Sequence, residues 1–122
     1  MTRFDLPRIP WPEIKNKILS DKYDLSLVFV ADKEMARLNS KYRAESRPTN
    51  VLAFPLAKNL GEIFIDLPRA LGEARTFKKK PKEHLLFLYI HALLHLKGLR
   101  HHTPKLLKIM RKTEQKWLKT LS

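Results

Sequence analysis

The residues best suited to chemistry are gathered in one short stretch of the chain. Four of the five histidines lie between residues 91 and 102. His91 and His95 are four residues apart, so on a helix they project from the same face, one turn from each other. Imidazole nitrogens placed in this way can reach a single metal ion. The stretch therefore predicts a metal site with His91 and His95 as two of its ligands.

A third ligand must come from beyond the helix that carries these two histidines. Gly98 stands where a glycine commonly ends a helix in a left-handed conformation. The chain can then turn back and present His101 or His102 to the metal. Three protein nitrogens leave a fourth position for water, which is typical of catalytic zinc. Zinc lowers the pKa of such a water toward about 7, so the pattern predicts a zinc-activated water and a hydrolase.

The histidines admit two other interpretations. A single histidine on an apolar helix is most often structural, but four within twelve residues favour a shared task. Metzincin proteases have similar histidine spacing, but they need a glutamate directly after the first histidine as general base. Ala92 occupies that position here, so a peptidase of that kind is not favoured. His84, about two helical turns before His91, is interpreted as a surface residue or as a support behind the ligands.

The charge of the chain predicts a polyanionic partner. Among 122 residues, 25 are Lys or Arg and 12 are Asp or Glu, a net charge of +13. A small domain with this surplus attracts nucleic acid. Basic residues cluster at 78–82 and again from Lys97 to Lys119, where Glu114 is the only acid. RNA or a ribosomal surface is therefore the expected partner, and a small-molecule or peptide substrate is disfavoured.

Length and composition predict one soluble, cytoplasmic domain over residues 1–122. The chain has no cysteine, which excludes disulfides and thiolate metal sites. Its longest apolar stretch, residues 85–96, is far shorter than the roughly 20 residues of a membrane-spanning helix. The first residues lack the apolar segment of a secretory signal. We therefore expect no membrane association.

The elements that position the histidines follow from the hydrophobic pattern. Strands are expected at 25–30, at 51–54, where Pro55 should stop the strand, and at 61–66. Helices are expected at 13–20, 32–42, 68–77, 83–96 and from 103 or 104 to 121. The predicted fold class is α/β (α+β), a single compact domain in which about five helices pack on a small mixed sheet. The metal site lies at the end of the buried helix 83–96.

At this point the sequence resembles the YbeY family of bacterial rRNA maturation factors, which are zinc-dependent single-strand-specific endoribonucleases. His91, His95 and His101 have the offsets of the three histidines of that family, and Gly98 matches its glycine. Further matches run through nearly the whole chain after the first strand, in the order of the family: Leu38-Asn39, Tyr42-Arg43, 48–55, 61–63, Pro68, Glu73-Ala74, Met110 and Glu114.

The resemblance implies a set of ligands and a catalytic residue. It implies one Zn2+ per chain held by His91, His95 and His101, and so favours His101 over His102. It also implies that Arg43 lines the active-site cleft, where a guanidinium offers a bidentate fork to phosphate oxygens. The implied substrate is a single-stranded rRNA precursor, and the implied partners are the small ribosomal subunit or its proteins. The implied role is rRNA maturation and ribosome quality control.

An alternative function is a ribosome-associated RNA-binding factor with a mainly structural zinc and little cleavage. Departures from the family pattern favour it: Ala92 replaces a usual glycine, and Arg100 replaces a usual aspartate before the third histidine. Asn50, Ala53 and Glu62 also differ from the usual residues. These changes leave the three zinc ligands intact.

Overall fold

Three strands and five helices make up the part of the chain that the computed structural model describes, residues 8–43, 49–98 and 103–121. Along the chain the elements are α1 (Trp11–Ile18), β1 (Asp24–Val30), α2 (Asp32–Arg43), β2 (Val51–Ala57), β3 (Leu60–Asp66), α3 (Leu67–Thr76), α4 (Pro81–Leu96) and α5 (Pro104–Leu121). Every helix and strand expected from the hydrophobic pattern is present, with shifts of up to three residues at the ends.

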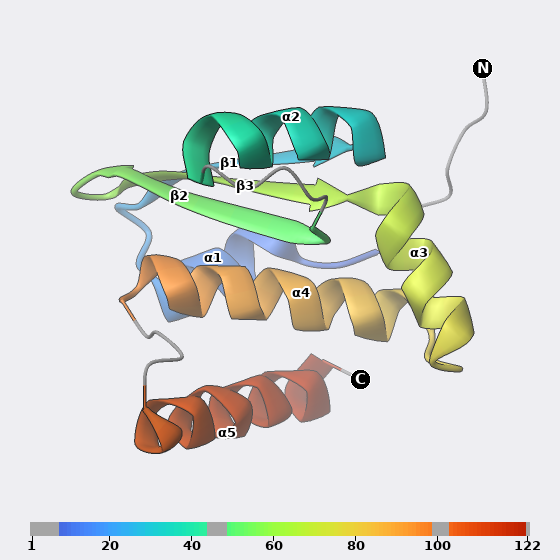
Figure 1. Cartoon of the computed structure of the whole chain (residues 1–122). Helices are drawn as coiled ribbons and strands as arrows, with labels where there is room; N and C mark the ends of the chain where they lie inside the picture. Colours follow the sequence, from blue (N-terminus) through green and yellow to red (C-terminus); the bar gives the residue numbers. More distant parts are fainter. Residues whose placement is uncertain (1–7, 44–48, 99–102, 122) are drawn as a thin grey trace.

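The sheet has the strand order β1-β3-β2. β1 runs parallel to β3, and β2 runs antiparallel to it. Helix α2 covers one face of the sheet, α1 and α4 lie on the other, and α5 packs outside α4 (Figure 1). This arrangement confirms the predicted α/β class with a small mixed sheet in a single compact domain.

Strand β2 continues through Pro55, so the prediction that this proline stops the strand was wrong. β2 pairs with β3 as far as Ala57, with an irregularity between Pro55 and Ala57. The physical reason is its place in the sheet. β2 is an edge strand, where a residue without a backbone N–H costs no ladder hydrogen bond on its open side.

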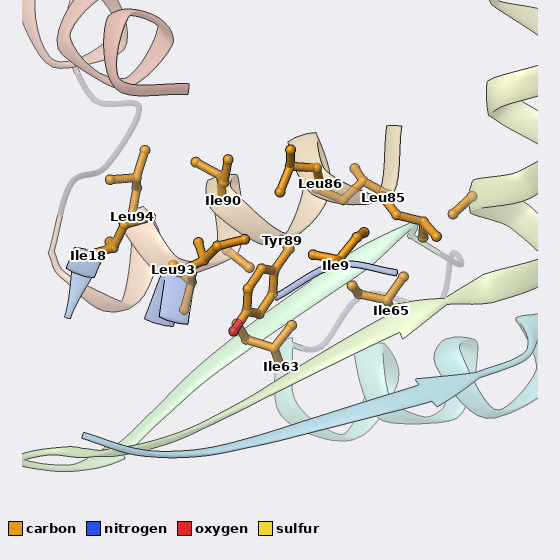
Figure 2. Packing of buried hydrophobic residues seen from close by; sticks show 14 of the residues in the cluster. Ile9, Ile18, Ile63, Ile65, Leu85, Leu86, Tyr89, Ile90, Leu93 and Leu94 are labelled. Atoms are coloured by element: carbon orange, nitrogen blue, oxygen red, sulfur yellow. The ribbon is translucent and has the colours of Figure 1, made fainter. Parts of the chain in front are cut away.

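The main core lies between α4 and the sheet. Ile63 and Ile65 of β3 face Tyr89 and Leu93 of α4, and all four side chains are fully buried (Figure 2). On the other face, Met35 and Leu38 of α2 pack on Leu52. Successive β3 and β2 residues thus alternate between two hydrophobic layers, as the period of a strand requires. Helix α4 is held by apolar contacts along most of its length, which gives the histidines on it a rigid support.

Prolines and a glycine set the ends of the helices near the site. Pro12 and Pro81 lie inside the first turns of α1 and α4, where a missing N–H costs nothing, so both helices begin two residues earlier than expected. Helix α4 ends at Leu96, and Gly98 follows with φ of 102° and donates its N–H to the His95 carbonyl at 3.0 Å. The left-handed glycine predicted to end this helix is therefore confirmed. None of the helices in the described ranges has the length and apolar character needed to span a membrane.

Candidate metal centre

His91 and His95 face the same hollow on the surface of α4. The hollow has a volume of about 390 Å³ and is also lined by Thr49, Asn50 and Phe87. Both histidines are partly exposed, so their rings are accessible from solvent. Helix α4 brings them together because its apolar face is anchored in the core and its two histidine positions fall on adjacent turns. The arrangement has the spacing and the access that a shared ion needs.

The third predicted ligand lies outside the described residues. His101 and its competitor His102 both fall in 99–102, the segment between α4 and α5. The described residues alone contain no group of three or more His, Cys, Asp or Glu side chains that could hold a metal. A site of His91, His95 and His101 would take one ligand from beyond them, so this ligand set stays a prediction.

Arg43, the predicted catalytic residue, is the last residue of α2. The described side chains do not include that of Arg43, so its direction stays a prediction. Helix α2 packs on the face of the sheet opposite α4 (Figure 1). Any contact between Arg43 and a substrate at the histidines must therefore be made around the sheet.

A carboxylate from α5 lies behind His91. Glu114 is 5% exposed, and its Oε1 atom lies 3.8 Å from His91 Nδ1. That distance is too long for a hydrogen bond but short for a charge interaction. Burial raises the pKa of Glu114 to about 7, and the nearby Arg111 opposes the rise. Carboxylates commonly stand behind metal-binding histidines, where they orient the ring and raise its basicity.

A second buried network links α4 to the segment that enters β2. His84 is 4% exposed, so its interpretation as a surface residue was wrong. Its Nε2 atom lies 3.0 Å from Glu73 Oε1, and Asn50 Nδ2 donates to the same oxygen at 3.2 Å. The carboxylate can only accept, so His84 is the donor through Nε2. Glu73 thus holds Asn50, which lines the histidine hollow, in place.

Sequence reasoning placed Glu114 and Glu73 in the family pattern but assigned them no role. A signal was available for Glu114. It follows Leu107 by seven residues and precedes Trp117 and Leu118 by three and four, which puts it on the inward face of α5. An acid on the apolar face of a basic helix indicates a buried partner. For Glu73 no comparable signal exists, because both its partners are distant in the sequence.

The sequence matches a known protein family over nearly its whole length. A sequence model of the family described as "Endoribonuclease YbeY" matches residues 12–122. The Endoribonuclease YbeY of Aster yellows witches'-broom phytoplasma is 37% identical over 109 residues, which cover 82% of this chain and 75% of that protein. The Endoribonuclease YbeY of Clostridioides difficile is 35% identical over 113 residues, covering 84% and 74%.

A solved structure agrees with these sequence matches. The solution structure of TM1509 from Thermotoga maritima superimposes with a TM-score of 0.64 at 32% identity, covering 87% of this chain and 72% of that one. The family match spans the sheet and the helices α1 (from its second residue) to α5, including His91, His95 and Glu114. The chain therefore belongs to the YbeY family of endoribonucleases.

Proposed function

We propose that this chain is a zinc-dependent, single-strand-specific endoribonuclease that acts on rRNA precursors in the cytoplasm, in rRNA maturation and ribosome quality control. The observation that carries the proposal is the pair His91 and His95, which line one hollow from adjacent turns of a rigid helix. The names of the relatives support RNA cleavage as the reaction class. The net charge of +13 suits an RNA substrate.

We assign the metal to His91, His95 and His101, with one Zn2+ per chain. The residues present suit it: two accessible imidazoles share a hollow, and the buried Glu114 carboxylate lies on the Nδ1 side of His91. When bound, zinc supplies a Lewis acid that can activate water and offset negative charge on the phosphate.

The side chains of the protein itself supply position and charge. We assign Glu114 the support of His91 through the charge contact at 3.8 Å, and Glu73 and His84 hold Asn50 at the edge of the hollow. We assign Arg43 to the scissile phosphate, where a guanidinium presents two parallel N–H donors and stays charged. Its contribution is electrostatic and grows as charge builds up in the transition state.

The test of the metal assignment measures zinc and cleavage separately. His91→Ala, His95→Ala and His101→Ala should each lose most of the bound zinc, and His102→Ala is the matched control that should keep it. Cleavage of an unstructured RNA should stop with a chelator and return with added zinc. Retention of zinc by His101→Ala, with loss in His102→Ala, would assign the third ligand to His102 instead.

The test of Arg43 separates catalysis from folding. Arg43→Ala should remain folded and zinc-loaded but cleave about 10²–10³ times more slowly, as expected for the loss of one positioned donor. Arg43→Lys should recover only part of the rate, because an ammonium keeps the charge but not the bidentate fork. Cleavage by Arg43→Ala at the wild-type rate would refute the assignment.

Zinc binding without cleavage would favour the other candidate, a ribosome-associated RNA-binding factor with a structural metal. Ala92 is the feature that favours it, since this residue is almost fully buried and lines the histidine hollow where the family has a glycine. An Ala92→Gly variant that gains cleavage without gaining zinc would indicate that the extra methyl group impairs the reaction.

A further inference from the structure

A basic groove lies between the start of α4 and the second half of α5. It has a volume of about 800 Å³, twice that of the histidine hollow. Six lysines line it: Lys79, Lys80 and Lys82 from one wall, and Lys112, Lys116 and Lys119 from the other. Among the described residues that line this groove, Glu83 is the only acid. We refer to this hollow as the lysine groove.

The lysine groove meets the histidine hollow at Phe87. This side chain lines both hollows, and its ring centroid lies 6.0 Å from that of His91. The two hollows therefore follow each other along successive turns of α4. From Lys82 to His91 the helix rises by roughly 14 Å, at about 1.5 Å per residue. A ligand several nucleotides long can occupy both.

We propose that the lysine groove binds the single-stranded RNA segment that flanks the scissile phosphate, with its phosphates on the lysines and a base against Phe87. This proposal rests on the proposed function, because it takes the histidine hollow as the place of cleavage. It adds a binding subsite and the direction in which the substrate leaves that hollow, along α4 toward its N-terminus.

The chemistry of the groove fits an unpaired strand. Two rows of lysines across a groove follow a phosphate backbone, and the apolar Leu86 and Leu118 between them offer a floor to base or sugar. Phe87 is partly exposed, and the Lys79 ammonium lies 5.4 Å from its ring centroid. Lys79 is an exposed, flexible side chain that a base can displace. Stacking on an aromatic ring needs an unpaired base, so it distinguishes a single strand from a duplex.

The charge test uses two triple variants of equal charge. Lys112→Gln/Lys116→Gln/Lys119→Gln removes one wall of the groove, and Lys17→Gln/Lys22→Gln/Lys33→Gln removes three exposed lysines that line none of the hollows described above. Binding of a fluorescent, unstructured RNA of about 12 nucleotides is measured by anisotropy as salt is raised. Each phosphate contact on a single strand contributes about 0.7 to the salt slope, so the groove variant should flatten the slope by about 2. Over the tenfold range from 1 M to 0.1 M salt, this difference in slope should lower the affinity of the groove variant by up to ~100-fold relative to wild type. The control variant should lose much less affinity.

The aromatic test replaces Phe87 without changing charge. Phe87→Leu keeps an apolar side chain and should weaken binding of the same RNA by about fivefold or more, whereas Phe87→Trp should bind as well as the wild type. Thermal melting of all variants checks that they are folded. Equal affinities for Phe87→Leu and Phe87→Trp would remove the base contact from the proposal.

These measurements separate the groove from the proposed function, because binding is measured without cleavage. Loss of affinity in the groove variant but not in the control, with no cleavage by zinc-loaded wild type, would support the groove and refute the nuclease. Equal affinities of the two triple variants, with normal cleavage by wild type, would overturn the groove alone. Tighter binding of a duplex of the same sequence, lost in the groove variant, would overturn its assignment to single strands.

Discussion

Asp66 is a buried carboxylate whose replacement by asparagine should stabilise the protein at neutral pH. It is fully buried at the end of β3, and its Oδ1 atom accepts the Arg69 N–H at 3.1 Å, which caps helix α3. The neighbouring Asp32 carboxylate at the start of α2 binds the Arg69 guanidinium through two contacts of 3.1 Å. The cluster therefore joins the starts of helices α2 and α3. It also places the Asp66 carboxylate near that of Asp32, at a buried position that solvent cannot screen.

The size of the effect follows from the pKa of Asp66. Burial, together with a hydrogen bond to Asp32, raises this pKa from 3.8 to about 6. Between pH 3.8 and about pH 6, Asp66 holds its proton more tightly in the folded protein than in the unfolded chain. The free energy of unfolding therefore falls as pH rises through this range. At about 1.4 kcal/mol for each pH unit, the loss from Asp66 amounts to roughly 3 kcal/mol at most.

The other acids with shifted pKa values do not disturb this comparison. Each titrates in another pH range or is present in both wild type and Asp66→Asn. The hydrogen bond with Asp66, followed by the contacts with Arg69, lowers the pKa of Asp32, so the stability that Asp32 contributes is lost only below its ordinary value of 3.8. Glu114, with its pKa raised to about 7, adds a decline of the same sign as Asp66 that both proteins share. The difference between wild type and Asp66→Asn therefore isolates Asp66.

The assay is urea unfolding of wild type and Asp66→Asn at pH 4, 5, 6 and 7. Asparagine is an equally good N-cap and its amide can donate to Asp32, so the variant keeps both contacts without a buried charge. Its stability relative to wild type should rise by about 1–3 kcal/mol from pH 4 to pH 7. Asp66→Ala is the control that also loses the cap, at a cost of about 1 kcal/mol. A difference between wild type and Asp66→Asn that does not change with pH would refute the reasoning.

Three further predictions concern the core, the sheet and the site. Leu93→Ala, at a fully buried position, should lower the free energy of unfolding in urea by about 2–5 kcal/mol, and a smaller loss would mean that the cavity collapses. Gly61→Ala should destabilise the protein by about 1–3 kcal/mol, because a Cβ there meets the Tyr23 hydroxyl and lies 3.1 Å from the Phe54 carbonyl oxygen. Gly72→Ala, where a Cβ meets nothing within 4 Å, should instead raise the melting temperature, and a fall in both variants would contradict this contrast. Glu114→Gln should weaken zinc binding by about 10–100-fold in competition with a chelator, and an unchanged Kd would show that this carboxylate does not support His91.

Local sequence patterns determined the elements and the pair of histidines. The four-residue spacing places His91 and His95 on one face of any helix, whatever surrounds it, because the period of the helix is set by the backbone. Gly98 follows the end of α4 as expected, because the left-handed backbone conformation there is unfavourable for residues other than glycine. The β-branched and aromatic run Ile63-Phe64-Ile65 likewise predicted the strand at 61–66.

Only the tertiary structure decided which residues stand beside the histidines. Pro55 lies inside a strand because β2 is at the edge of the sheet. The local pattern of apolar residues predicts strands but not their order in the sheet. His84 is buried because Glu73, from another helix, accepts its hydrogen bond. Glu114 reaches His91 because α5 packs against α4 (Figure 1). The last two contacts join residues 11 and 23 positions apart. The free energy that selects all three comes from packing of the whole core rather than from the spacing of neighbouring residues.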